Sequence, residues 1–123
     1  ARQERLVALA STDPANPYGA ALAWPESDVR LARVAGSYVL IADGELAGYL
    51  EKGGRSVHLW AGVDADEVAA VLADLAGRHG RFSIETVNGT PVGQSELGPR
   101  LADHGFAVSA RGLVWRGMAR AGR

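Results

Sequence analysis

The sequence lacks cysteine, has almost no net charge and contains no apolar run of membrane-spanning length. Without cysteine, the 123-residue chain can form neither a disulfide scaffold nor a cysteine-based zinc site. Its formal net charge of −1 argues against binding nucleic acid by bulk electrostatics alone. No charged, apolar and small-residue leader opens the chain. These absences favour a cytoplasmic protein without a membrane partner, and the first residue, Ala1, favours a piece of a longer protein.

The length and the ordinary apolar fraction of 47% fit one domain, residues 1–123, with a real core. We expect residues 1–36 to form an extended or irregular lead-in and residues 37–123 to form an α+β core. No internal repeat or low-complexity segment divides the chain.

Three apolar runs between Ser37 and Ala61 organise the rest of the sequence. They are Tyr38–Ala42, Leu46–Leu50 and Val57–Trp60. Asp43-Gly44 and Gly53-Gly54 separate them, and these dipeptides tolerate the positive φ of tight hairpin turns. Large apolar residues follow one another within the runs, which indicates that both sheet faces are at least partly covered. The pattern predicts a three-stranded antiparallel meander.

A helix is predicted after the meander. Asp64 is a good N-cap, and Glu67 stands three residues later, as in a capping box. Apolar residues then recur at helical spacing, and Gly80 is the expected stop. They are Val68, Val71, Leu72 and Leu75.

The remaining elements complete an order of β-β-β-α-β-α-β-(β). Arg81–Val87 alternates like a half-buried strand, and Asn88-Gly89 turns the chain. Ser95 is expected to cap a second helix that ends near His104. Two short strands follow, at Phe106–Ser109 and Leu113–Arg116. Helices on one face of a mostly antiparallel sheet are the simplest way to bury both apolar stripes.

The lead-in, residues 1–36, contains four shorter patterns. Arg2–Ala10 reads as one or two helical turns. Ser11–Gly19 is rich in turn residues. Ala20–Trp24 is compatible with a short extended segment, and Val29, Leu31 and Val34 are compatible with an edge strand.

Four cations are the candidate nucleic-acid contacts. Lys52 and Arg55 flank the Gly53-Gly54 turn, where a basic tip can reach phosphates; the alternative is a solvated turn. Arg111 and Arg116 belong to a basic C-terminal stretch around Trp115, where arginine and an aromatic ring could pair with phosphates and bases. The alternative there is a buried Trp115 surrounded by snorkelling arginines. The whole stretch comprises Arg100, Arg111, Arg116, Arg120 and Arg123.

Other polar residues favour structural roles. The three histidines are too scattered for a local metal motif, and a Ser95–Asp103–His104 triad lacks a nucleophile-elbow signature. Solvated strand faces explain the glutamates that an acid–base pair would need. Asp13, Asn16 and Tyr18 are expected to brace the sheet, or else to contact a neighbouring module. We therefore predict no catalytic residue and no metal site. The histidines and glutamates concerned are His58, His79, His104, Glu45, Glu51 and Glu85.

Several blocks together carry a family resemblance over essentially the whole chain. The most specific are Asp13-Pro14-Ala15-Asn16-Pro17-Tyr18-Gly19 and Tyr49-Leu50-Glu51-Lys52-Gly53-Gly54-Arg55, and ETVNGTPVGQS and LADHGF follow later. They resemble the extreme C-terminal region of the large helicase-related (Lhr) family of bacterial ATP-dependent helicases of the DEAD/DEAH type.

This resemblance implies a parent protein with a motor of two RecA-like lobes and a winged-helix domain. A C-terminal region of winged-helix and β-barrel modules would follow, similar to winged-helix DNA glycosylases of the alkyl-purine type, which links the family to DNA repair. ATP and Mg²⁺ would belong to the motor, because this chain has no G-x-x-x-x-G-K-[ST] loop, and no cofactor is expected in this piece.

The chain would then be a non-catalytic accessory module. Its partners would be DNA or RNA, reached through the parent protein, and neighbouring winged-helix modules. The alternative is a protein–protein or self-assembly domain that forms a homo-oligomer without touching nucleic acid. A third alternative, an independent small enzyme, would need a deep pocket around a perturbed carboxylate.

Overall fold

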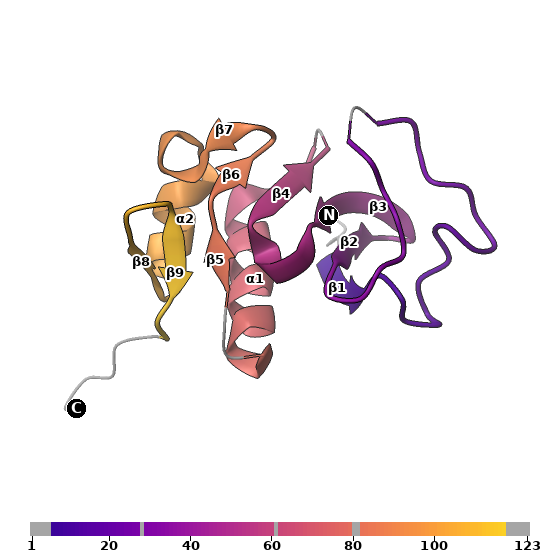
Figure 1. Cartoon of the computed structure of the whole chain (residues 1–123), viewed down its shortest axis with the longest axis horizontal. Coiled ribbons are helices and arrows are strands. Elements are labelled where there is room, and N and C mark those ends of the chain that lie inside the picture. Colours follow the sequence, from indigo (N-terminus) through magenta and orange to yellow (C-terminus); the bar gives the residue numbers. More distant parts are fainter. Residues whose placement is uncertain (1–5, 28, 61, 80–81, 118–123) are drawn as a thin grey trace, which may run out of the picture.

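The computed structural model describes residues 6–27, 29–60, 62–79 and 82–117. Within these ranges it shows an α+β fold with a six-stranded sheet, ordered β1-β2-β3-β4-β6-β7, and a three-stranded sheet, ordered β5-β9-β8 (Figure 1). The elements are β1 Leu6–Ala10, β2 Tyr38–Ala42, β3 Glu45–Leu50, η1 Lys52–Gly54, β4 Ser56–Leu59, α1 Ala65–His79, β5 Ser83–Ile84, β6 Thr86–Val87, β7 Thr90–Pro91, η2 Val92–Gln94, α2 Leu97–Asp103, β8 Phe106–Val108 and β9 Leu113–Trp115.

The predicted meander is confirmed. β2 pairs antiparallel with β3, from Tyr38↔Leu50 to Ala42↔Glu45, and β3 pairs antiparallel with β4, for example Tyr49↔His58. Asp43 and Gly44 both adopt positive φ, as a twisted two-residue hairpin requires. The connection between β3 and β4 is not the tight two-residue turn expected at Gly53-Gly54. It is the 3₁₀ turn η1.

The predicted helix at Arg2–Ala10 is wrong: Leu6–Ala10 is strand β1, and residues 1–5 lie outside the described part of the chain. β1 pairs antiparallel with β2, from Leu6↔Ala42 to Ala10↔Tyr38. A helix of one or two turns has little stability of its own. Pairing satisfies the backbone groups along the edge of β2, and this long-range gain decides the conformation.

The single strand predicted at Arg81–Val87 is split in two at Glu85. Ile84 pairs with Leu113 in the smaller sheet, whereas Thr86 pairs in parallel with Ser56 in the larger one. The Arg55 carbonyl accepts hydrogen bonds from the amides of Glu85 (2.8 Å) and Thr86 (3.1 Å), which turns the chain from one sheet to the other. The Asn88-Gly89 turn is confirmed between β6 and β7, with positive φ at both residues.

Helix α1 begins after Asp64, whose side chain accepts a hydrogen bond from the Asp66 amide at 3.2 Å. Glu67 does not play its predicted capping role, since its carboxylate accepts from the Leu6 amide (3.1 Å) and joins the helix to β1. The apolar stripe is buried at Val68, Leu72 and Leu75, and Val71 packs against it. The expected stop at Gly80 lies outside the described residues.

The second helix begins later than predicted, and Ser95 is not its cap. The Ser95 hydroxyl donates instead to the Val92 carbonyl at 2.8 Å, which closes η2, and Glu96 precedes the helix without a side-chain cap. The two final strands lie within their predicted ranges, and Phe106 is buried against the core.

The connection 11–37 covers the meander face opposite α1, so the prediction that both faces are covered is confirmed for β2 and β3. Val39 and Tyr49 are buried there, the Trp24 ring meets Tyr49 edge-on at 5.9 Å, and the Tyr49 hydroxyl donates to the Ala32 carbonyl. Apart from an isolated bridge at Tyr18↔Leu22, the described residues of this connection form no strand, so the suggested edge strand is absent.

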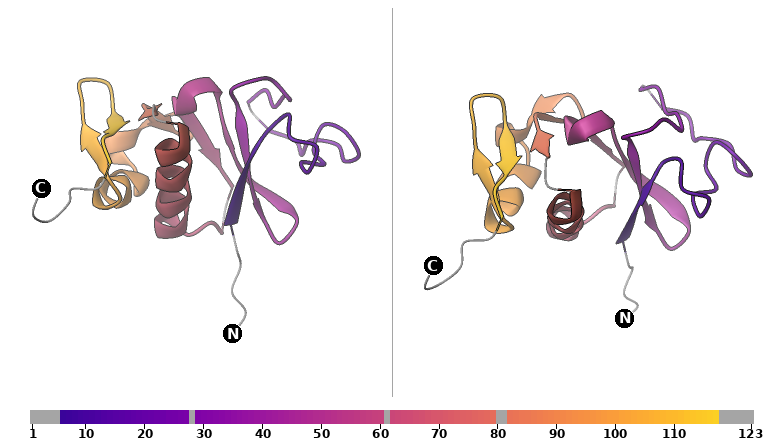
Figure 2. Two further views of the ribbon diagram at one scale, coloured as in Figure 1. Left: turned by 90° about the horizontal axis from the view of Figure 1, so that it is seen from below. Right: turned by 60° about the horizontal axis from the view of Figure 1, so that its bottom comes forward.

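Helix α1 lies between the meander and the C-terminal hairpin in both views of Figure 2. One hydrophobic cluster joins both sheets and both helices, with Leu40, Leu72, Leu101 and Leu113 among its members. Within the described residues, neither helix is long and apolar enough to cross a membrane.

Candidate nucleic-acid interface

All four predicted cations lie on the surface. Lys52 opens η1, Arg55 follows it, Arg111 lies in the turn between β8 and β9, and Arg116 follows β9. Each side chain is exposed. Among the described residues, none of the four side chains forms an ion pair or hydrogen bond, so their charges are available to an external anion.

The fold brings three of these cations to one side of the molecule. The Arg55 carbonyl is bonded to the backbone of Glu85, and a Cβ built at Gly112 would lie 2.9 Å from the Cα of Glu85. Glu85 therefore lies between Arg55 and the turn that carries Arg111. In the left view of Figure 2, η1 and the turn between β8 and β9 both lie at the top of the molecule.

Arg116 lies apart from that group. Its amide donates to the Gly105 carbonyl at 3.0 Å, at the opposite end of the hairpin from Arg111. An extended chain of four residues spans roughly 13 Å, which is the separation between Gly112 and Arg116 along β9. The four predicted residues thus form a group of three and a separate cation.

A separate groove lies between the C-terminal half of β4 and the connection 11–37. It is open and has a volume of about 890 Å³. Because residues alternate along a strand, Val57 faces the core while Ser56 and His58 face outward. The lining comprises Glu26, Ser27, Val29, His58, Leu59, Trp60, Asn88 and Gly89.

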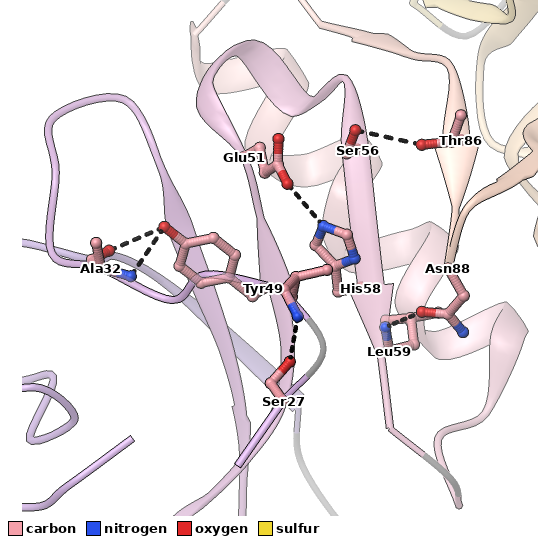
Figure 3. A network of polar contacts seen from close by, with 10 residues as sticks. Ser27, Ala32, Tyr49, Glu51, Ser56, His58, Leu59, Thr86 and Asn88 are labelled. Carbon is pink, nitrogen blue, oxygen red and sulfur yellow. Dashed lines mark hydrogen bonds and ion pairs between the residues drawn. The ribbon is translucent and has the colours of Figure 1, made fainter. Parts of the chain in front are cut away.

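Polar contacts hold the groove residues in place (Figure 3). His58 Nε2 pairs with a Glu51 carboxylate oxygen at 2.8 Å, and the Asn88 side-chain oxygen accepts from the Leu59 amide at 2.8 Å. Further along β4, the Thr86 hydroxyl donates to the Ser56 hydroxyl at 3.2 Å.

Sequence reasoning did not identify this groove. Its members come from three distant segments, and only the parallel pairing of β4 with β6 brings Asn88 beside Leu59. The sequence identifies Trp60 only as the end of an apolar run. The alternation of the polar Ser56 and His58 with the apolar Val57 and Leu59 was the available signal, but it does not show which strand lies alongside.

The structural roles expected for the three histidines are in keeping with their contacts. His58 pairs with Glu51, His104 Nε2 lies 3.3 Å from an Asp66 carboxylate oxygen, and the His79 ring lies 5.6 Å from that of Tyr38. The possible Ser95–Asp103–His104 triad is not assembled, because His104 faces Asp66. The described residues contain no group of three or more potential metal ligands.

The predicted bracing loop is confirmed. Asn16 is buried, its amide donates to the Ser11 carbonyl at 2.8 Å, and its oxygen accepts from the Tyr18 amide at 3.0 Å. The Tyr18 hydroxyl donates to the Gly44 carbonyl and accepts from the Leu46 amide, both at 3.2 Å, at the β2–β3 turn. Arg33, which sequence reasoning missed, donates hydrogen bonds to backbone carbonyls of the same loop.

Trp115 packs against the core, as predicted by the alternative in which this residue is structural. Its ring meets Phe106 edge-on at 5.3 Å and lies against the core. Trp24 likewise has ring neighbours in Tyr18 and Tyr49. Among the described residues, Trp60 has no aromatic partner, although it lines the groove.

Comparison with known proteins gives two relatives, and no family model matches the sequence. The chain is 45% identical over 124 residues to the "Lhr helicase/ probable uracil glycosylase" of Mycolicibacterium smegmatis, with 95% of the chain covered. It is 36% identical over 116 residues to the "Lhr helicase/uracil glycosylase" of Escherichia coli, with 89% covered. The matches span only 8% of each relative's length. The chain is therefore homologous to a small region of the Lhr helicase/uracil glycosylase proteins.

Proposed function

We propose that the chain is a non-catalytic accessory domain at the extreme C-terminus of a longer Lhr-type ATP-dependent DNA helicase in the cytoplasm. In this role it binds nucleic acid and positions neighbouring winged-helix modules, while ATP and Mg²⁺ act in the motor of the parent protein. The observation that carries the proposal is the set of exposed, unpaired cations around η1 and the β8–β9 turn. The helicase and glycosylase names of the relatives support it, because both activities require that nucleic acid be held.

The arrangement suits a phosphate backbone. Lys52 and Arg55 flank a short turn, and Arg111 lies on the other side of Glu85, so a strand passing over this side would meet two cations and then, beyond the Glu85 carboxylate, a third. Charge-assisted hydrogen bonds from lysine and arginine to phosphate are the usual means of positioning nucleic acid without reading its sequence. Arg116 would meet the backbone further along.

Replacing Lys52 and Arg55 together by Ala tests the proposal. Each phosphate contact to a single strand contributes about 0.7 to the slope of log affinity against log salt. The double variant is therefore expected to bind single-stranded DNA more weakly at low salt, with a slope smaller by about 1.4. The slope is measured by fluorescence anisotropy over a series of salt concentrations, with both the 123-residue chain and the parent protein.

The control removes the same charge elsewhere. Arg78→Ala combined with Arg100→Ala deletes two exposed cations from α1 and α2. An equal loss of slope in the two double variants would show that only net charge matters. An unchanged slope in the Lys52/Arg55 variant would remove η1 from the interface.

A second candidate function is self-assembly through strand β1. β1 forms an edge of the six-stranded sheet, its five residues carry no charge, and Val7 is 42% exposed. Such an edge is a template for pairing with another strand. Light scattering tests this alternative: a concentration-dependent dimer that disappears on Val7→Lys supports it, and a monomer at high concentration rejects it.

A further inference from the structure

We infer that the groove beside β4 binds an unstacked base of a single-stranded nucleic acid. This inference rests on the proposed function, since the cations of η1 would hold the phosphates of the same strand. It adds a second kind of contact, in which side chains of the groove meet a base.

The groove has a suitable size and floor. Its volume of about 890 Å³ lies within the range of roughly 300–1,000 Å³ that small-molecule sites occupy. The floor is the outward face of β4, and the walls are formed by Glu26, Ser27 and Val29 on one side and by the Asn88-Gly89 turn on the other. A hydrogen bond from the Val29 amide to the Ser27 hydroxyl (3.1 Å) holds the first wall.

Two groove side chains are held by one polar atom while another stays free. Asn88 uses its oxygen to accept from the Leu59 amide, and its NH₂ group has no partner among the described residues. His58 uses Nε2 toward Glu51, and its Nδ1 is likewise without a partner there. Such fixed groups suit the edge of a base, which presents both donors and acceptors.

Trp60, which is half-buried, contributes an aromatic ring to the same lining. It lines the groove but stacks on no other ring within the described part of the chain. Bases stack on exposed aromatic rings in many proteins that bind single strands. A base on Trp60 would have the free Asn88 and His58 groups on the other parts of the lining.

The cations lie where the strand would continue. Arg55 immediately precedes Ser56 at the start of β4, about 10 Å from His58 along the strand, and Lys52 lies on the far side of η1. Of the nearby carboxylates, Glu51 is paired with His58. Glu26 is exposed at the rim, where it can accept from an N–H group of a base.

The test compares two single strands of about 12 nucleotides, oligothymidylate and an abasic strand of the same length and charge. The wild-type chain is expected to bind oligothymidylate about tenfold more tightly, because stacking of one base contributes on that order. Trp60→Ala should abolish the difference and Trp60→Phe should keep most of it. Asn88→Asp keeps the oxygen that binds Leu59 but removes the NH₂ donors, and it should reduce the difference.

Trp115→Phe is the matched control, because that ring lies outside the groove. It should leave the preference for base-bearing strands unchanged. The same pair of strands made with ribose distinguishes RNA from DNA as the ligand. The inference holds for the sugar whose base-bearing strand binds more tightly than its abasic counterpart, provided that Trp60→Ala abolishes this difference.

The failures are distinguishable. Equal binding of both strands by wild type, with a salt slope that still depends on Lys52 and Arg55, would overturn the groove and leave the proposed function standing. A preference for bases that survives Trp60→Ala would also overturn it. No binding of either strand would overturn both proposals.

Discussion

Arg33 holds together the long connection between β1 and β2. Its guanidinium donates to the backbone carbonyls of Asn16 (2.7 Å), Tyr18 (3.0 Å) and Asp13 (3.3 Å). A planar fork of donors can serve three acceptors at once, which a lysine ammonium on a flexible stem does less well. The local fold of Asp13–Tyr18 thus depends on a residue some twenty positions later.

We expect Arg33→Lys to lower the free energy of unfolding by about 2 kcal/mol, since hydrogen bonds from charged groups contribute about 1.5–3 kcal/mol each and lysine retains some of them. Urea denaturation measures the change. Arg30→Lys is the control, because Arg30 is exposed and has no hydrogen bond among the described residues. Equal stability of the two variants would contradict the role given to Arg33.

Gly112 is the second residue on which packing depends. A Cβ at this position would collide with the Ile84 carbonyl oxygen, which is backbone and cannot move aside. We expect Gly112→Ala to destabilise the protein by about 3 kcal/mol or more, as overpacking against backbone does. Thermal unfolding measures it.

Gly93→Ala provides the comparison for this substitution. A Cβ at Gly93 would meet no atom within 4 Å, and its φ is not positive. The variant should be neutral or slightly stabilised, because alanine restricts the unfolded chain. Similar losses at both glycines would show that the close approach at Gly112 is not what matters.

At the scale of elements, β1 is joined to α1 by one side chain. The Glu67 carboxylate accepts from the Leu6 amide at 3.1 Å, and Leu6 is buried. Glu67→Ala should cost about 1–2 kcal/mol, because it leaves that amide without its partner. Glu67→Gln keeps an acceptor oxygen and should recover most of the loss.

Amide hydrogen exchange at Leu6 separates this effect from a general loss of helix stability. In Glu67→Ala the Leu6 amide should exchange faster while the amides of β3 keep their protection. Unchanged exchange at Leu6 would contradict the link between strand and helix.

Sequence reasoning succeeded where local chemistry decides an element. Asp43-Gly44 and Asn88-Gly89 turn the chain as predicted, since both pairs accept positive φ. It failed at β1, whose conformation depends on pairing with residues more than 25 positions away. It also failed at Glu85, where the carbonyl of Arg55 divides one apparent strand between two sheets.

At the scale of the whole molecule, one apolar cluster connects the two sheets. Leu6 and Leu40 of the larger sheet and Ile84 and Leu113 of the smaller one belong to it, with α1 between them. We therefore expect a single cooperative unfolding transition, in which tryptophan fluorescence and far-ultraviolet circular dichroism coincide. Two separate transitions would show that the C-terminal hairpin and α2 form an independent unit.

The candidate site belongs to this scale too, which explains why the sequence predicted only part of it. Lys52 and Arg55 could be picked out because they flank a turn. That Arg111 lies on their side and Arg116 does not depends on the hairpin and its contact at Gly112. The groove requires Glu26, His58 and Asn88 to meet, and only the complete topology brings these segments together.

The connection 11–37 is fastened at both ends and exposed in the middle. Ser11 and Asn16 bind it on one side, Arg33 and Tyr49 hold it on the other, and residues 19–23 are exposed. A protease that cut between Ala20 and Ala21 would therefore leave two fragments that stay associated, since the shorter one retains β1 within the sheet. The same position is where the chain could be divided into two separately made pieces that reassemble when mixed.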